Sequence, residues 1–182
     1  MSSPPLTPTG RVILGMIAFG RQTGYDIKQF VDKSTRHFWA ASYGQIYPEL
    51  RRLEEQGLIV GQSEPTGGRA RTVYELTDSG RAAFETWLEP DAHPMFEVRA
   101  EGMLKLFFSD IGTPRQRIQN IRAMREAHER TLAQLCAIHE TADSMPEGPQ
   151  MTLELGIGLH RGIVEWCEAA ERRLSEESAD AD

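Results

Sequence analysis

The sequence lacks the residue patterns of metal sites, disulfide frameworks and membrane spans. Its 182 residues include two cysteines, Cys136 and Cys167, without Cys-x-x-Cys spacing, so neither a zinc site nor a disulfide framework is expected. The five histidines form no His-Glu-x-x-His arrangement, and we expect no metal and no cofactor. No apolar run approaches the roughly 18 residues of a membrane span, because the run from Val12 to Phe19 stops at Gly20.

Catalytic and export patterns are also missing. The chain holds no Ser/His/Asp, Cys/His or phosphate-loop arrangement, so we predict that it is not an enzyme. Residues 1–8 contain neither a positive n-region nor an apolar h-region, which predicts a cytoplasmic protein. With 40% apolar and 26% charged residues, the composition is that of a soluble globular protein.

Negative charge is concentrated in the second half of the chain. The formal net charge is −7, and residues 1–90 hold 10 Lys+Arg and 10 Asp+Glu, whereas residues 91–182 hold 10 and 17. Attraction of the whole chain to nucleic acid is therefore not expected. Any such binding must come from local basic clusters on the first half.

The first half has the element order of a winged helix-turn-helix, whose third helix reads the DNA groove. Capping residues, apolar spacing and turn signals support this order. The predicted elements are helices over residues 8–19, 24–33 and 43–56, strands over 58–64 and 72–77, and a helix over 78–88. Pro48 would be the sixth residue of the third helix, where a proline is costly. Two interpretations stay open: the helix begins nearer Tyr47, or it carries a kink at Pro48.

Four motifs of this half resemble one known family. They are "GYDI" (24–27), "YGQIYPELRRLEEQGLI" (43–59), "GGRAR" (67–71) and "YELTDSG" (74–80). Their order and spacing are similar to those of PadR-family transcriptional regulators, over roughly residues 6–88. The resemblance implies a dimeric winged-helix repressor whose third helix enters the major groove and whose wing lies on the backbone or in the minor groove.

Two groups of residues are candidates for contacts with double-stranded DNA. Ser42, Tyr43 and Gln45 offer hydroxyl and amide groups to base edges from the start of the third helix. Glycines at the hairpin tip allow a positive φ and close backbone approach to DNA. The candidates for phosphate or minor-groove contacts are Arg51, Arg52, Gly67, Gly68, Arg69, Arg71, Lys33 and Arg36. For the tip and for Lys33 and Arg36, a solvated surface is the alternative. We assign Tyr47, Leu50, Leu53 and Tyr74 to the core and not to the DNA contacts.

The second half predicts an all-helical dimerisation domain. Two prolines mark a linker over residues 89–94, and helices are expected up to about residue 109, over 113–140 and over 150–176. The apolar stripes along these helices are too long to be buried within so small a domain, which favours a homodimer. The same length and helical character resemble the larger PadR subfamily. The candidate dimer residues are Leu155, Leu159, Gly162, Ile163, Trp166 and Ala170, and interspersed glycines suggest close approach of another backbone.

The predicted fold is mainly α with a small β-hairpin wing. It consists of a winged helix-turn-helix domain over residues 1–88, the linker, and a helical domain over residues 95–182 with a polar tail from about 175. The predicted function is a sequence-specific repressor on a pseudo-palindromic operator, with a small apolar or aromatic effector bound near Phe96, Phe107, Phe108 and Trp166. Plain helix packing is the alternative for these aromatics. A winged-helix module that binds protein and not DNA is the alternative function.

Overall fold

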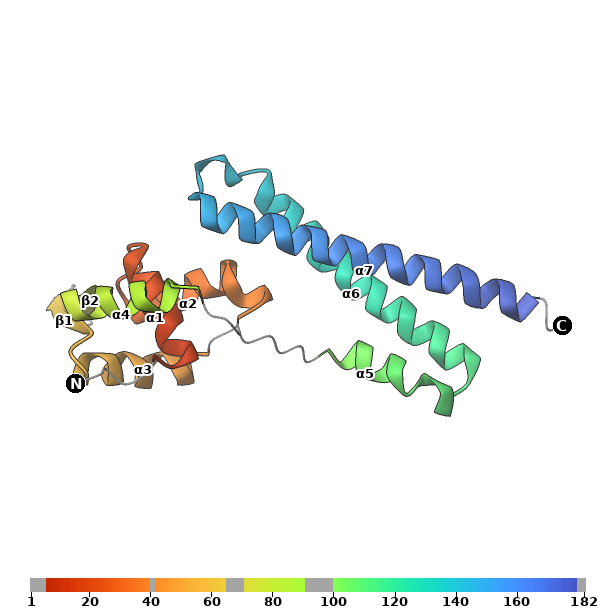
Figure 1. Cartoon of the computed structure of the whole chain (residues 1–182), viewed down its shortest axis with the longest axis horizontal. Helices are drawn as coiled ribbons and strands as arrows, with labels where there is room; N and C mark the ends of the chain where they lie inside the picture. Colours follow the sequence, from red (N-terminus) through yellow and green to blue (C-terminus); the bar gives the residue numbers. More distant parts are fainter. Residues whose placement is uncertain (1–5, 40–41, 65–70, 91–99, 180–182) are drawn as a thin grey trace. The chain divides into compact units, whose positions relative to one another are not determined.

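The chain forms two compact units, residues 1–94 and 95–182. The computed structural model describes residues 6–39, 42–64, 71–90 and 100–179 (Figure 1). These residues are mainly helical with a two-stranded antiparallel hairpin, which confirms the predicted fold class. The predicted tip residues Gly67, Gly68 and Arg69, and also Phe96 and most of the linker, lie outside the described residues. The domain boundaries that we expect from the sequence remain a prediction.

The first unit contains the elements expected of a winged helix-turn-helix. They are α1 (Pro8–Ala18), α2 (Gly24–Lys33), the 3-10 turn η1 (Thr35–His37), α3 (Tyr43–Glu55), β1 (Ile59–Glu64), β2 (Arg71–Leu76) and α4 (Asp78–Leu88). The strands pair from Ile59 opposite Leu76 to Glu64 opposite Arg71. We call this hairpin the wing.

Threonine side chains set the start of three of these helices. The hydroxyl of Thr7 accepts from the backbone N–H of Gly10 at 3.0 Å, and Thr23 accepts from Asp26 at 3.1 Å. Thr77 caps α4 in the same way, accepting from Gly80 at 3.0 Å. Each cap satisfies a first-turn N–H that has no partner within the helix. The first residues of α1, α2 and α4 are therefore readable from the sequence.

The core of the first unit forms where α1, α2 and α3 meet. The described side chains with no exposed surface at this junction come from all three helices, namely Ile13, Leu14, Ile27, Val31, Ile46, Leu50 and Leu53. Leu58, Ile59 and Tyr74 extend this core to the base of the wing. Since both Ile46 and Leu53 are fully buried, one face of α3 is fixed along nearly its whole length.

Pro48 lies inside α3, which runs continuously from Tyr43 to Glu55. The expectation that the helix begins nearer Tyr47 is therefore wrong. A proline here removes one donor, the N–H that would bond to the carbonyl of Gly44. The burial of Ile46 and Leu50 on either side of Pro48 offsets that loss.

The second unit is a set of helices dominated by two long ones. Its elements are α5 (Glu101–Phe107), η2 (Ser109–Ile111), α6 (Pro114–His139), η3 (Ala142–Ser144) and α7 (Glu147–Ala179). Helix α7 begins three residues before the predicted Gln150 and includes Pro149. A proline fits there because N–H groups of the first turn have no helical partner in any case.

Polar contacts join α6 to α7 beside a small apolar core. Glu171 accepts from Arg122 Nε at 3.0 Å and from Arg125 Nε at 2.8 Å. His128 and His160 face each other with their Nδ1 atoms 2.7 Å apart. The apolar cluster beside these contacts includes Ile121, Cys167 and Ala170.

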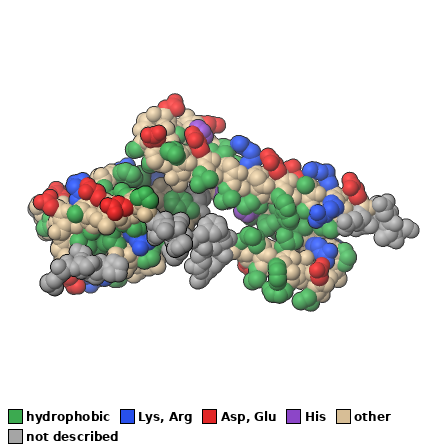
Figure 2. Space-filling view, viewed as in Figure 1, with side chains coloured by type: hydrophobic (Ala, Val, Ile, Leu, Met, Phe, Trp, Pro, Cys, Tyr) green, Lys and Arg blue, Asp and Glu red, His purple; other side chains and the backbone are tan. Residues whose placement is uncertain are grey.

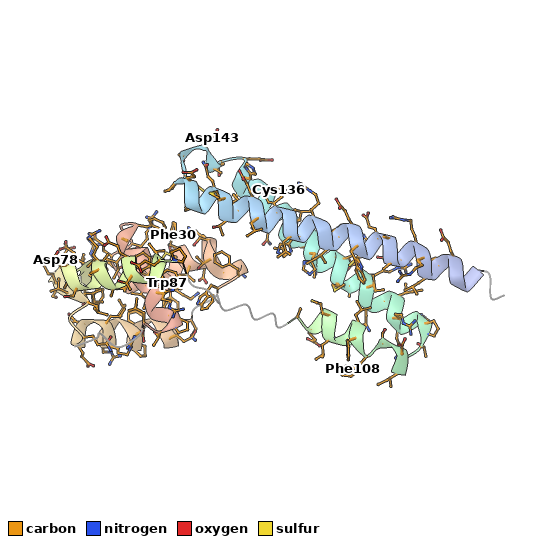
Figure 3. The ribbon with its side chains drawn as sticks, viewed as in Figure 1. Phe30, Asp78, Trp87, Phe108, Cys136 and Asp143 are labelled. Carbon is orange, nitrogen blue, oxygen red and sulfur yellow. The ribbon has the colours of Figure 1, made fainter. Side chains whose placement is uncertain are left out.

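Much of the apolar surface of the second unit is exposed. The exposed large side chains are Met103, Leu104, Phe107, Phe108 and Ile111 around α5, and Met151, Leu155, Leu159 and Trp166 on α7. Figure 2 shows hydrophobic side chains gathered over α5. In Figure 3, Phe108 lies on the side of α5 that faces away from α6. Within the described part of the chain, no helix is long and apolar enough to cross a membrane.

We predict that Gly80→Ala strongly destabilises the first unit. A Cβ at this position would lie 1.8 Å from the carbonyl oxygen of Leu58, and backbone at such a contact cannot move aside cheaply. The free energy of unfolding should fall by about 3 kcal/mol or more, measured by urea denaturation. Ser79→Ala, at the exposed neighbouring position, is the control and should change it by less than about 0.5 kcal/mol. Equal stability of both variants would contradict the contact.

Candidate nucleic-acid interface

The first turn of α3 presents three polar side chains to solvent. Ser42, Tyr43 and Gln45 are all exposed, whereas Ile46, the next residue, is fully buried. The helix therefore keeps its apolar side in the core while the start of the helix projects outward. An exposed helix start with hydroxyl and amide groups has the geometry required to reach base edges in a major groove.

A capping box holds this first turn. Gln45 Oε1 accepts from the backbone N–H of Ser42 at 2.9 Å and from the Ser42 hydroxyl at 3.1 Å. The side chain of Gln45 thus folds back on the residue that precedes the helix. Two of the three predicted base-reading residues are fixed relative to each other before any partner arrives.

Aromatic contacts orient Tyr43 on the same surface. Its ring stacks on Tyr47 with centroids 6.1 Å apart, and the ammonium of Lys28 on α2 lies 5.4 Å from its centre. Tyr47 is 42% exposed, so its assignment to the core was wrong. Its ring lies against Gly24, where an added Cβ would come within 2.8 Å of the ring. The predicted core positions Leu50, Leu53 and Tyr74 are confirmed as buried.

An ion-pair network ties α3 to the start of α1. Arg52 donates to Glu49 from Nε at 3.0 Å and from Nη2 at 2.5 Å, and the Thr7 hydroxyl also donates to Glu49. Burial alone would raise the pKa of the Glu49 carboxyl, but the hydrogen bonds from Arg52 and Thr7 hold that pKa below its ordinary value. Thr7 thus both caps α1 and anchors α3.

The cationic side chains that we expect to contact DNA differ in whether they already pair with a carboxylate. Arg51 is exposed, as are Lys33 at the end of α2 and Arg36 in η1. Arg52 is half-buried and bidentate to Glu49, so a DNA contact by Arg52 would compete with that carboxylate. Sequence reasoning missed the role of Glu49, although its position three residues before Arg52 is the spacing of a helical ion pair.

The described part of the wing is anchored at its base. The carboxylate of Glu54 on α3 accepts from the N–H of Gly61 at 3.0 Å, and the N–H of Tyr74 donates to the carbonyl of Gln22 at 2.8 Å. Arg71 pairs across the hairpin with Glu64 at 2.8 Å, with both side chains about half exposed. Exposed pairs of this kind contribute little to stability, so Arg71 can exchange Glu64 for another anion at low cost.

The candidate dimer residues lie on two faces of α7. Leu155 and Leu159 are 73% and 61% exposed, and Trp166 is 47% exposed. Gly162 has open space where a Cβ would be. Ala170 is instead buried in the cluster that packs α7 against α6, and Ile163 is partly buried beside it. The dimer role of all six residues remains a prediction.

The glycines of α7 do not allow close packing within the chain, with one exception. An added Cβ would meet nothing within 4 Å at Gly158 or Gly162, and at Gly156 it would lie 3.3 Å from Leu135. If the glycines at 158 and 162 permit close backbone approach, the approaching backbone lies outside the described residues of the second unit.

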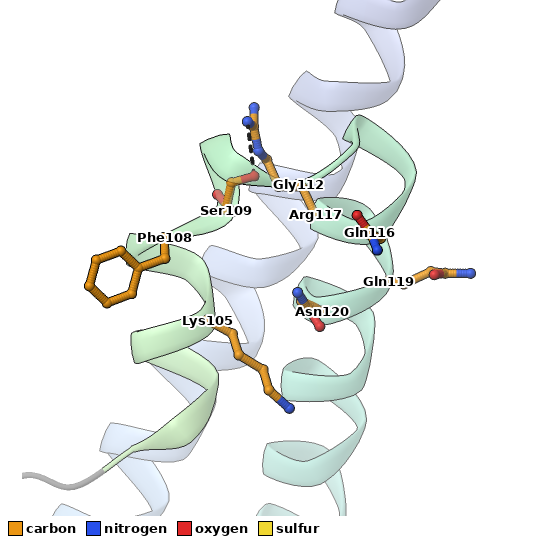
Figure 4. Close-up of a pocket in the computed structure, with 8 residues that line it drawn as sticks. All are labelled: Lys105, Phe108, Ser109, Gly112, Gln116, Arg117, Gln119 and Asn120. Atoms are coloured by element: carbon orange, nitrogen blue, oxygen red, sulfur yellow. Dashed lines mark hydrogen bonds between the residues drawn. The ribbon is translucent and has the colours of Figure 1, made fainter.

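A groove in the second unit lies between α5 and the start of α6 (Figure 4). Its volume is about 320 Å³, and it is lined by Lys105, Phe108, Ser109, Gly112, Gln116, Arg117, Gln119 and Asn120. The ring of Phe108 points away from α6 in Figure 4. Phe107 is 79% exposed and contacts Phe108 edge-on at 5.0 Å. The effector pocket expected near Phe96, Phe107, Phe108 and Trp166 remains a prediction.

Two family models match the chain in succession. Residues 13–86 match the Transcriptional regulator PadR-like family, and residues 98–175 match the Virulence activator alpha C-term family. In sequence, the chain is 36% identical over 97 residues to the Negative transcriptional regulator PadR of Bacillus subtilis, which covers 53% of each protein. The chain thus spans about half the length of this relative.

Solved structures resemble nearly the whole chain. Bacillus subtilis PadR in complex with operator DNA has a TM-score of 0.83 at 26% identity, covering 90% of this chain and 97% of that one. The same protein in complex with p-coumaric acid has a TM-score of 0.76 at 26% identity, covering 91% and 97%. The Vibrio cholerae virulence activator AphA has a TM-score of 0.69 at 26% identity, covering 92% and 98%.

We predict that Glu49→Gln lowers the free energy of unfolding by about 1–2 kcal/mol at pH 7. The pKa of Glu49 is lower in the folded state, so its contribution is present above the unfolded pKa of about 4.3 and is lost as the pH falls through the folded value. Urea denaturation at pH 7, 5, 4 and 3 should show the difference from wild type shrinking in acid. Glu55→Gln, exposed on the same helix, should differ little at any pH. A difference for Glu49→Gln that does not depend on pH would contradict the ion pair.

Proposed function

We propose that this chain is a sequence-specific DNA-binding repressor that acts as a homodimer. Its residues 13–86 match the PadR-like transcriptional regulator family, and its residues 98–175 match the virulence activator C-terminal region. The observation that carries the proposal is the exposed first turn of α3, with Ser42, Tyr43 and Gln45 on a helix whose opposite face is fully buried. A similar protein is solved with operator DNA. In this proposal the chain is a binding protein and not an enzyme.

The proposed DNA contacts divide by chemistry. Ser42, Tyr43 and Gln45 read base edges, while Arg51 lies later on the helix and suits a phosphate. Lys33 and Arg36 add phosphate contacts near the end of α2. Arg71, with Gly67, Gly68 and Arg69 of the tip, places the wing on the backbone or in the minor groove. Because Glu54 and Gly61 link α3 to the wing, the helix and the base of the wing approach the duplex as one body.

The proposed dimer forms through the second unit. Leu155, Leu159 and Trp166 expose apolar surface along α7, and Gly162 leaves room for a second backbone. A symmetric dimer presents two α3 helices to a pseudo-palindromic operator, with half-sites about 34–36 Å apart or a multiple of that. The net charge of −7 on residues 91–182 keeps this unit away from the duplex.

We further propose a small apolar or aromatic effector that releases the repressor, since a similar protein is solved with p-coumaric acid. DNA binding also implies the compartment that holds the DNA, which the sequence predicts to be the cytoplasm. A winged-helix module that binds another protein is the second candidate function. The balance of 10 cations and 10 anions in residues 1–90 favours it, because a DNA-binding surface is usually basic.

We predict that DNA affinity falls steeply with salt and that Arg51→Ala weakens binding to all sequences alike. Each lost phosphate contact should make the salt slope shallower by about one unit in each subunit. Affinities for DNA from upstream of the protein's own gene and for random DNA, measured at several salt concentrations, test this. Glu55→Ala, at an exposed position on the same helix, is the charge-changing control and should not flatten the slope. Binding to a partner protein but to no DNA would favour the second candidate.

We predict that Gly162→Leu weakens the dimer without disturbing the fold of the chain. An added Cβ at Gly162 would meet nothing within 4 Å among the described residues, so we expect the leucine side chain to collide with the second molecule of the dimer. Gly162→Ala is the matched control and should raise helix stability by up to about 1 kcal/mol. Light scattering over a range of protein concentrations gives the dimer dissociation constant. The same constant for both variants and wild type would move the dimer interface away from this face of α7.

A further inference from the structure

The capping box at the start of α3 restricts what Gln45 can recognise. A carbonyl oxygen has two lone pairs, and Gln45 Oε1 already accepts two hydrogen bonds, from the Ser42 N–H at 2.9 Å and the Ser42 hydroxyl at 3.1 Å. The acceptor half of the amide is therefore occupied. The other half, the Nε2 group, is a donor only, and it belongs to an exposed side chain.

The same arrangement recurs at the start of α6. There Gln116 Oε1 accepts from the Thr113 N–H at 2.8 Å and from the Thr113 hydroxyl at 3.1 Å. Both boxes combine a hydroxyl residue before the helix with a glutamine three residues later. The orientation of the Gln45 amide thus follows from capping chemistry and does not depend on its place in the first unit.

In the major groove, a donor-only side chain can make two hydrogen bonds with guanine, one with adenine or thymine, and none with cytosine. Guanine offers two acceptors there, O6 and N7, whereas thymine offers one, O4. Adenine places the N6 amino donor beside N7, and a glutamine that pairs with both atoms must use its Oε1 as acceptor. Cytosine offers only the N4 donor.

Resting on the proposed function, we infer that Gln45 is a specificity-determining residue that reads guanine through its Nε2 donor while Oε1 stays in the capping box. The two Nε2 hydrogens donate to O6 and N7 of the same base. Lysine, which also presents its donors from a single nitrogen, pairs with guanine in this way. Ser42 then acts as a positioning residue, because its hydrogen bonds withdraw the acceptor that adenine would require.

The test begins with selection of preferred sites from a random duplex library by the full-length wild-type protein and by Gln45→Ala. We expect one position in each half-site to lose its preference in Gln45→Ala, and that position to hold guanine in the wild-type sites. Replacing this guanine by 7-deazaguanine, which lacks N7, should weaken wild-type binding about tenfold or more. The same replacement should cost Gln45→Ala little.

Gln45→Glu provides a second variant that retains the cap. Its carboxylate still accepts from the Ser42 N–H but offers DNA an acceptor in place of a donor, so the preference should change from guanine to cytosine, whose N4 group donates. Gln116→Ala, which removes the equivalent box on α6, is the matched control. It should lower thermal stability and leave base preference unchanged.

Three results would overturn the inference while the proposed function stands. The first is an adenine at this position whose replacement by purine, which lacks the N6 group, costs as much as Gln45→Ala. The second is a G·C pair there at which 7-deazaguanine costs the wild-type protein no affinity, and the third is sequence-specific binding in which Gln45→Ala relaxes no position. Absence of any sequence preference in the wild-type protein would instead overturn the proposed function, and this inference with it.

Discussion

The burial of one face of α3 is the constraint on which the first unit depends. Ile46, Leu50 and Leu53 have no exposed surface, and burial of each such side chain contributes about 1.5–3 kcal/mol. The polar contacts of Glu49 and Glu54 contribute a comparable amount individually, about 1–3 kcal/mol each, but they are directional. Apolar packing therefore sets where α3 lies, and the carboxylates fix its rotation and its distance from α1 and the wing.

The second unit differs from the first in how much of its apolar surface is buried within the chain. Its described buried core is small, and large apolar side chains stay exposed on both α5 and α7. A pair of helices with apolar side chains on both its inner and its outer face can bury only the inner face by itself. The first unit has a core that joins three helices and the base of the wing, whereas the second unit has a small core and leaves apolar side chains exposed on α5 and α7.

Local signals made most of the fold predictable. The capping threonines at positions 7, 23, 77 and 113 indicate where their helices begin, because a cap involves only residues close in sequence. Pro48 and Pro149 were the misleading positions, since the tolerance of a helix for proline depends on packing and on exact distance from the start of the helix. The exposure of Tyr47 could not be read from its spacing either, because it depends on how α2 and Gly24 lie beside it.

The candidate site was predictable as a list of residue types but not as a set of hydrogen bonds. The sequence indicates that Gln45 lies where a base could be read. That its oxygen is occupied by Ser42 depends on side-chain geometry. Similarly, Arg51 and Arg52 are adjacent and alike in sequence, and only the fold separates an exposed cation from one bound to Glu49.

Cys167 lies in the small core between α6 and α7, so the rate at which its thiol is modified can measure how often the two helices separate. Its side chain has no exposed surface, and burial raises the pKa of its thiol, so the reactive thiolate is scarce while the helices stay together. A thiol reagent can modify it only during moments when α6 and α7 separate. The rate of modification therefore reports how often this helix pair opens, and the partly exposed Cys136 in the same chain supplies the reference rate for the closed state.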